Sequence, residues 1–216
     1  MDAAFGGFCF DISHPVLDFA ASRGVSDHRI ARGPGGRNPS RRTSQIGAFT
    51  AGGGVRSIND IRSLLAAGAE KVAINTAATK NPELIRRAAQ TFGSQCIVLS
   101  IEAKQIVPGR WEAYTDNGRQ RTGLDVIGWA KRGEKLGAGE ILLTSVDMEG
   151  TERGFDKELI RAVTKAVSVP VIASGGVGSP QDVAECFKQT DADAVAVASI
   201  LHYHKYGVDD IKHKLI

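Results

Sequence analysis

Two short stretches of the sequence combine paired glycines with a serine and an aspartate. Ala51–Ile61 reads AGGGVRSINDI and Ala173–Val183 reads ASGGVGSPQDV, with an offset of 122 residues from Gly53 to Gly175. Glycines between the end of a strand and the start of a helix let backbone N–H groups approach an anion without interference from a Cβ atom. We therefore expect two phosphate sites, which fit a ligand phosphorylated at both ends.

Small polar residues follow each glycine pair one predicted strand later. The first site is expected to combine Gly53 and Gly54 with Asn75 and Thr76, and the second to combine Gly175 and Gly176 with Ser199. The alternative is that the glycines only turn a tight corner between strand and helix. The repetition of the whole arrangement favours phosphate binding over this alternative.

Carboxylates form the second chemical signal, because three of them follow predicted strands. Glu102 closes CIVLSIE, and Asp147 and Glu149 follow EILLTSV. In a barrel of parallel strands, catalytic groups project from the carboxyl ends of different strands, and a carboxyl pair there can act as general acid and base. The alternative is that each pairs with a nearby cation such as Lys104 or Arg153. Glu102 and Glu149 are the stronger candidates for catalysis.

From about Phe49 onward, the sequence alternates short apolar runs with amphipathic segments of helical length. This pattern predicts an α/β fold with parallel strands that are covered on both faces. The predicted strands are Lys71–Asn75, Cys96–Ala103, Glu140–Val146, Pro170–Gly176 and Ala194–Ser199, and the predicted helices are Ser57–Ala67, Asn81–Thr91, Thr122–Leu136, Asp156–Val167 and Ser179–Lys188. Together with the internal repeat, they indicate two half-barrels of a (β/α)8 TIM-type barrel.

The repeat also predicts that this barrel is incomplete at its N-terminal strands. The counterpart of the strand at Cys96–Ala103 would fall before Met1, and the counterpart of the strand at Glu140 would fall near position 18, where PVLDFAAS is a weak candidate. We therefore divide the chain into an atypical segment over 1–48, poorly ordered or non-homologous, and a phosphate-binding barrel domain over 49–216.

Composition narrows the remaining functional classes. The net charge is +3, and the basic excess is concentrated between residues 23 and 42, so no nucleic-acid partner is expected. The three cysteines lack metal-ligand spacing and suit a reducing compartment. Because neither a membrane span nor a signal-peptide pattern is evident, we expect a cytoplasmic protein without a membrane partner. Neither a metal nor an organic cofactor is indicated.

Five longer stretches extend these motifs into a family resemblance. GGGVRSINDIRSLLAAGAEKVAINTAATKNPELI, FGSQCIVLSIEAK, TGLDVIGWAKRGEKLGAGEILLTSVDMEGTERGFD, VPVIASGGVGSPQDVAE and ADAVAVASILHY together resemble the cyclase subunit of imidazole glycerol phosphate synthase, over about Phe49–Leu215. The resemblance implies a lyase of histidine biosynthesis built as a (β/α)8 barrel. Such a cyclase takes ammonia from a glutaminase subunit and converts a phosphoribulosyl-formimino aminoimidazole carboxamide ribotide into imidazole glycerol phosphate and an aminoimidazole carboxamide ribotide.

The resemblance also implies roles for individual residues. Those matching the first phosphate site are Gly54, Asn75 and Thr76, and those matching the second are Ser174, Gly175, Gly176 and Ser199. Thr144 matches a threonine that faces the substrate. Lys71 and Glu140 match two charged residues of an ammonia gate at the opposite mouth of the barrel.

At two positions the chain departs from the family pattern. The family uses two catalytic aspartates; the first lies in the part that does not match, and Glu102 occupies the position of the second. Glu149 replaces an aspartate of the family's DRDGT motif that faces or supports the substrate, so the resemblance implies a substrate-binding role for Glu149. Each exchange moves a carboxylate outward by one methylene, and a misplacement of about 1 Å can lower a rate on the order of a hundredfold.

Two alternatives to the cyclase therefore stay open. One is a catalytically impaired barrel that binds a phosphorylated ligand or the glutaminase partner without turnover. The other is a related enzyme that transfers ammonia to a sugar, or the related sugar isomerase.

Overall fold

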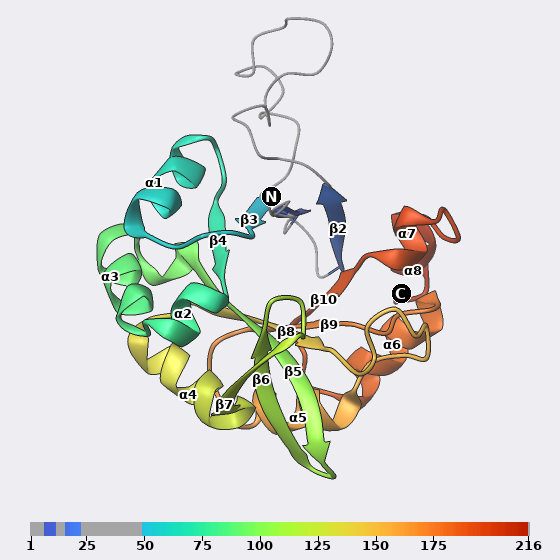
Figure 1. The fold of residues 1–216 in the computed structure, drawn as a ribbon. Helices are drawn as coiled ribbons and strands as arrows, with labels where there is room; N and C mark the ends of the chain where they lie inside the picture. Colours follow the sequence, from blue (N-terminus) through green and yellow to red (C-terminus); the bar gives the residue numbers. More distant parts are fainter. Residues whose placement is uncertain (1–6, 12–15, 23–48, 216) are drawn as a thin grey trace, which may run out of the picture.

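Parallel strands arranged in a ring, with helices outside it, make up most of the structure. The computed structural model describes residues 7–11, 16–22 and 49–215. Figure 1 shows the helices following one another around the outside of the strands. From residue 49 onward, six strands of the ring run parallel, namely β3 (Phe49–Gly52), β4 (Lys71–Ile74), β5 (Ile97–Val107), β8 (Glu140–Ser145), β9 (Val171–Ser174) and β10 (Ala194–Val197). All five predicted strands are thereby confirmed.

Two N-terminal strands complete the ring in an irregular way. β2 (Val16–Ser22) pairs in parallel with β10, and β1 (Gly7–Asp11) pairs antiparallel with both β2 and β3. The weak strand candidate near position 18 is therefore a strand. The chain forms a (β/α)8 barrel that is incomplete in its N-terminal part, because the antiparallel β1 breaks the parallel pattern. Other parts of the predicted segment over 1–48 lie outside the described residues, so its separate status stays a prediction.

The structure describes eight helices, and the five that the sequence predicts lie close to the predicted residues, apart from one helix start. They are α1 (Ile58–Ala66), α2 (Thr76–Lys80), α3 (Glu83–Phe92), α4 (Val126–Leu136), α5 (Lys157–Thr164), α6 (Pro180–Gln189), α7 (Ser199–His202) and α8 (Val208–His213), with a 3-10 turn at Ser94–Cys96. Helices that follow the parallel strands cover the outer face of the sheet, and those after β10, α7 and α8, are short.

The internal repeat extends to the helix starts. Ser57 caps α1 by accepting a hydrogen bond from the Asp60 amide, and the Asp60 carboxylate accepts one from the Ser57 amide. Ser179 and Asp182 make the same reciprocal pair at the start of α6. Each pair is a capping box, which satisfies amides that the first helical turn leaves without partners.

Two apolar clusters hold the barrel together. The larger one lies between the strands and the helices. The smaller one fills the inside of the ring with one residue from each of five adjacent strands, namely Ala73, Val98, Leu142, Ile172 and Ala196. Because side chains alternate along a strand, residues two positions away from these also point inward.

A long hairpin leaves the barrel after β5, and the sequence analysis did not predict it. β5 continues past its pairing with β8 and turns back into β6 (Arg110–Thr115), which pairs with β7 (Gln120–Asp125). The predicted helix start at Thr122 is therefore wrong. Thr122 donates a hydrogen bond to the Ala113 carbonyl at 2.6 Å within the hairpin, and the helix begins only after Asp125 caps it.

Among the described residues, no helix combines the length and the apolar character that crossing a membrane requires.

Candidate functional site

A row of polar side chains lies inside the barrel near the carboxyl ends of the strands. Glu102 on β5 is in register with Thr144 on β8, which is in register with Ser174 on β9. Thr144 and Ser174 each lie two positions after an inward-facing residue of the smaller cluster, and Glu102 lies four positions after one. Because side chains alternate along a strand, all three side chains point to the inside of the barrel. Adjacent strands lie about 4.8 Å apart, so the row brings a carboxylate and two hydroxyls within reach of one ligand.

Both glycine pairs lie at this same rim of the barrel. Gly53 and Gly54 follow β3, and Gly175 and Gly176 follow β9, which runs in the same direction through β4, β5 and β8. All four glycines have positive φ angles, of 93°, 70°, 95° and 96° respectively. This left-handed conformation favours glycine, so the two turns repeat a backbone shape as well as a sequence.

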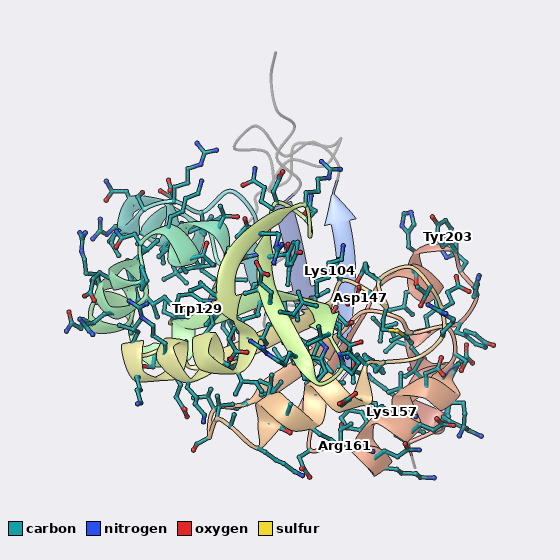
Figure 2. All side chains as sticks on the ribbon, turned by 60° about the horizontal axis from the view of Figure 1, so that its bottom comes forward. Lys104, Trp129, Asp147, Lys157, Arg161 and Tyr203 are labelled. Carbon is teal, nitrogen blue, oxygen red and sulfur yellow. The ribbon has the colours of Figure 1, made fainter. Side chains whose placement is uncertain are left out.

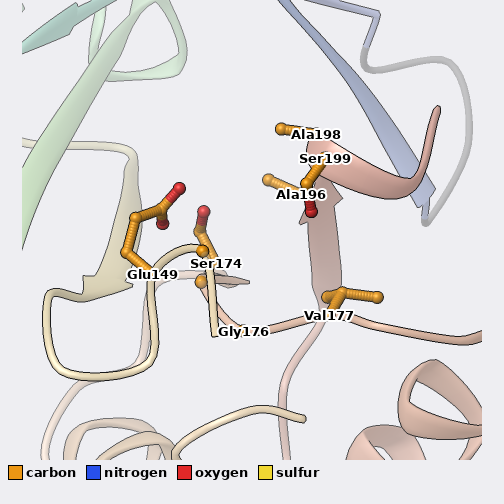
Figure 3. Close-up of a pocket in the computed structure, with 9 residues that line it drawn as sticks. Glu149, Ser174, Gly176, Val177, Ala196, Ala198 and Ser199 are labelled. Atoms are coloured by element: carbon orange, nitrogen blue, oxygen red, sulfur yellow. The ribbon is translucent and has the colours of Figure 1, made fainter. Parts of the chain in front are cut away.

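The second glycine turn lines a pocket at the rim (Figure 3). The pocket is small and open to solvent at the rim. Its lining includes Ser174, Gly175, Gly176 and Ser199, all four of which were predicted for the second phosphate site. Figure 3 shows Glu149 and Ser174 on one side of the opening and Ser199 on the other.

Close packing explains why glycine is needed in this turn. A Cβ atom on Gly176 would overlap the Gly154 carbonyl and lie 2.9 Å from Met148 Cβ. A Cβ atom on Gly175 would lie 2.7 Å from the Ser145 carbonyl. The turn is therefore pressed against the loop after β8, and any larger residue would displace it.

The first glycine turn is more open than the second. Gly53 and Gly54 are exposed, whereas Gly175 and Gly176 are buried. The predicted partner Thr76 lies next to the rim as the first residue of α2, and its side chain is partly buried. The two glycine turns at this rim therefore differ: the turn at Gly175 and Gly176 is buried, and the turn at Gly53 and Gly54 is exposed.

Asn75 was predicted to bind phosphate, but its side chain already hydrogen-bonds other groups of the protein. Its Nδ2 donates to the Tyr114 carbonyl at 3.4 Å, and the amide also hydrogen-bonds the Glu102 carboxylate. Asn75 therefore connects the end of β4 with the hairpin and with the candidate catalytic group. A role in phosphate binding would require it to share these bonds.

Glu102 occupies an environment that favours its protonated form. Burial is the largest cause and raises the pKa of the Glu102 carboxyl, and the nearby Asp116 and Glu149 carboxylates raise it further. Hydrogen bonds from the Gly118 amide, at 2.7 Å, and from Asn75 act in the opposite direction. A carboxyl with a raised pKa can exchange protons with a substrate closer to neutral pH.

Glu149 stands over the second glycine turn. Its Oε2 would lie 3.3 Å from a Cβ on Gly175, so the carboxyl lines the pocket next to the turn. The residue reaches solvent at the rim, but the protein around its carboxyl group still desolvates it and raises its pKa. A carboxylate here acts against anion binding, unlike the glycine amides beneath it.

Asp147, the third carboxylate considered, has a structural contact. Its Oδ2 accepts a hydrogen bond from the Gln105 amide at 2.7 Å and ties the loop after β8 to the hairpin. Figure 2 shows Asp147 and Lys104 near the base of the hairpin, while Lys157 and Arg161 lie on α5 outside the barrel. The alternative considered for Asp147, an ion pair with a nearby cation, gives way to this backbone contact.

The sequence analysis missed the β6–β7 turn, which reaches back to the site. Its Gly118 is the donor to Glu102, and the sequence TDNGRQ contains the Asn-Gly pair that marks a hairpin turn.

Lys71 and Glu140 lie at the opposite rim. They are the first residues of β4 and β8, two positions before the inward-facing Ala73 and Leu142, and they form an ion pair with β5 between their strands. Their side chains are only 19% and 18% exposed. The structure thus brings together the two residues predicted for the gate.

Within the described part of the chain, no cluster of three or more His, Cys, Asp or Glu side chains is placed to hold a metal.

Comparisons with known proteins agree with this architecture. The family model described as "Histidine biosynthesis protein" matches residues 41–207. The chain is similar to the imidazole glycerol phosphate synthase subunit HisF of Lactococcus lactis subsp. cremoris strain SK11, with 54% identity over 169 residues, and to that of strain MG1363, with 52% identity over 169 residues. Each match covers 78% of this chain and 65% of the relative, so the chain spans about two thirds of the length of these proteins. The chain belongs to the histidine biosynthesis protein family.

Proposed function

We propose that the protein is an imidazole glycerol phosphate synthase cyclase, a lyase of histidine biosynthesis in the cytoplasm. It would combine ammonia with a phosphoribulosyl-formimino aminoimidazole carboxamide ribotide and release imidazole glycerol phosphate and an aminoimidazole carboxamide ribotide. The observation that carries the proposal is the placement of both glycine turns and the Glu102–Thr144–Ser174 row at one rim of a barrel of this family.

The rim has two glycine turns, one for each phosphate of a bisphosphate substrate. The turn at Gly53 and Gly54 would bind one phosphate, and the turn at Gly175 and Gly176, with Ser174 and Ser199, would bind the other. The reacting carbons would then lie between the two turns, near the Glu102–Thr144–Ser174 row.

Glu102 would move protons during the reaction. Ammonia adds to the ketose carbonyl, water leaves as the imine forms, and ring closure then breaks the bond that releases the ribotide. Each step needs a proton at one heteroatom and its removal from another. A carboxyl whose pKa is raised by burial can serve as both donor and acceptor in turn.

Ammonia would enter from the opposite rim. We propose that a glutaminase subunit binds there and that the Lys71–Glu140 ion pair is part of the gate it faces. The pair is only slightly exposed, so a molecule that passes along the barrel axis has to displace it or pass beside it.

The direct experiment is to measure turnover of the bisphosphate substrate by the purified chain with ammonium salt as nitrogen donor. We expect imidazole glycerol phosphate as product and loss of turnover by about a hundredfold or more in Glu102→Gln. Lys157→Gln, outside the barrel on α5, is the matched control and should keep its rate. If a folded preparation gives no product, the enzymatic proposal is wrong.

Two observations favour a second function, binding without turnover. The Glu149 carboxyl stands over a phosphate cradle, and Glu102 stands where the family has an aspartate. If calorimetry shows that the bisphosphate binds while no product forms, the protein is a phosphate-binding barrel rather than a cyclase.

A further inference from the structure

The β6–β7 turn, residues 116–119, has an unusual backbone. Asp116, Asn117 and Gly118 have φ angles of 56°, 54° and 73°, so three consecutive residues adopt the left-handed conformation. Only glycine adopts it without steric cost, although aspartate and asparagine tolerate it better than other residues. Non-glycine residues kept in this conformation often occur at functional sites, where the surroundings hold them.

Two contacts hold this turn against the rim of the barrel. The Gly118 amide donates to Glu102 Oε2 at 2.7 Å. On its other side, Gly118 packs so closely on Val146 that a Cβ atom would lie 2.6 Å from Val146 Cγ1. Because Val146 directly follows β8, the turn is seated on the strand next to the one that carries Glu102.

The turn also changes the charge around Glu102. Asp116 is one of two carboxylates that raise the pKa of Glu102, the other being Glu149 on the loop after β8. The Gly118 amide lowers the same pKa, as does Asn75 from the end of β4. One short turn thus supplies both a donor that favours the carboxylate and a negative charge that opposes it.

We propose that the β6–β7 turn is a positioning element of the active site, in which the Gly118 amide fixes the Glu102 carboxyl and the Asp116 side chain sets the local charge. This inference rests on the proposed function, in which Glu102 is the proton carrier. The role of the strained backbone is to place the amide where Glu102 reaches it.

The test measures the pKa of Glu102 directly, so it does not depend on turnover. Carboxyl carbons of glutamate are labelled in the full chain, and Glu102→Gln identifies the signal of interest by its loss. The titration is then repeated in Asp116→Asn and in Gly118→Ala. Asp191→Asn, which removes an exposed carboxylate from the loop before β10, is the charge-matched control.

The proposal predicts opposite shifts from the two ends of one turn. Asp116→Asn removes a repelling charge and should lower the pKa of Glu102, whereas Gly118→Ala displaces the donor and should raise it. Asp191→Asn should leave it unchanged. A role limited to closing the hairpin would give no such pair of shifts, and an unchanged pKa in both variants would overturn the proposal.

A double variant separates displacement of the turn from loss of the fold. Val146→Ala removes both methyl groups that a Cβ on Gly118 would meet, so Gly118→Ala/Val146→Ala should return the pKa of Glu102 toward that of the parent. If the double variant melts like the parent and the pKa stays shifted, the amide is not positioned by this packing and the proposal is wrong.

Turnover adds a second readout where the parent chain is active. Gly118→Ala should lower kcat by about tenfold or more with less than about threefold change in KM, because the substrate cradles are untouched while the proton carrier moves. A parent without turnover but with the predicted pKa shifts would contradict the proposed function and leave the positioning intact.

Discussion

Lys71 and Glu140 form an ion pair inside the barrel although 69 residues separate them in the chain. β5 lies between their strands, and both residues point inward at the rim opposite Glu102. The two opposite charges neutralise each other at one end of the barrel, whereas carboxylates and glycine turns lie at the other end. The two ends of the barrel therefore offer different chemistry.

The first prediction concerns the stability of this pair. Lys71→Met leaves Glu140 partly buried without its partner and should lower the free energy of unfolding by about 1–3 kcal/mol in urea titration. Glu83→Ala breaks the exposed Glu83–Arg86 pair, whose side chains are 55% and 49% exposed, and should change it by less than about 0.5 kcal/mol. Equal effects of the two variants would show that the barrel pair is no more stabilising than a surface pair.

The second prediction concerns the enclosed glycine turn. Gly176→Ala combines a positive φ of 96° with overlap of the Gly154 carbonyl, so it should destabilise the fold and abolish the phosphate binding proposed for the pocket. Gly123→Ala is the control, because its φ is 74° but nothing lies within 4 Å of the added Cβ. We expect about 1 kcal/mol for the control and at least about 2 kcal/mol more for Gly176→Ala, measured by chemical denaturation. Similar losses in both would mean that backbone strain alone accounts for the glycine.

The sequence predicted the barrel from elements whose patterns are strong. Buried parallel strands such as Glu140–Ser145 are nearly continuous apolar runs, and the two serine capping boxes mark helix starts with local chemistry. These signals depend only on near neighbours in the chain. The strand pairing of Val16–Ser22 depends on distant partners, so its register with β10 could not be predicted.

The sequence named candidate residues for the site but not the contacts that they make. Glu102 was identified from its place at a strand end, yet its hydrogen-bond donors come from Asn75 and from Gly118 on two other elements. The hairpin that brings Gly118 back was missed because Thr122 was assigned to the following helix. A carboxylate's partners are set by how such elements fold back on one another, which periodicity does not report.

The third prediction concerns the dependence of stability on pH. The pKa of Glu102 is raised from its ordinary value of 4.5, so the folded chain holds a proton that the unfolded chain releases. As pH rises from about 4 toward 7, wild type should therefore lose stability relative to Glu102→Gln. Glu185 has a pKa lowered by its hydrogen bond from Lys157, so wild type should gain stability relative to Glu185→Gln over the lower part of the same range. Urea titrations at several pH values would test both signs, and parallel curves for the two variants would contradict them.

The fourth prediction concerns Glu149 as a barrier to anions. Its carboxyl lies over Gly175 and lines the pocket, so its negative charge should weaken anion binding there once it ionises. Burial raises its pKa, and binding should therefore weaken as pH rises through that raised value.

Sulfate is a suitable probe because its charge stays constant over this range, and its affinity can be measured by calorimetry at low ionic strength. Glu149→Gln should bind sulfate about three- to tenfold more tightly than wild type near pH 7, and its affinity should no longer depend on pH in this way. Glu152→Gln lies in the same loop but has its carboxylate bonded to Lys205, so it should change the affinity by less than about twofold. If Glu149→Gln and wild type bind sulfate equally at every pH, the carboxyl does not face the bound anion, and the second cradle is not the site that the pocket geometry indicates.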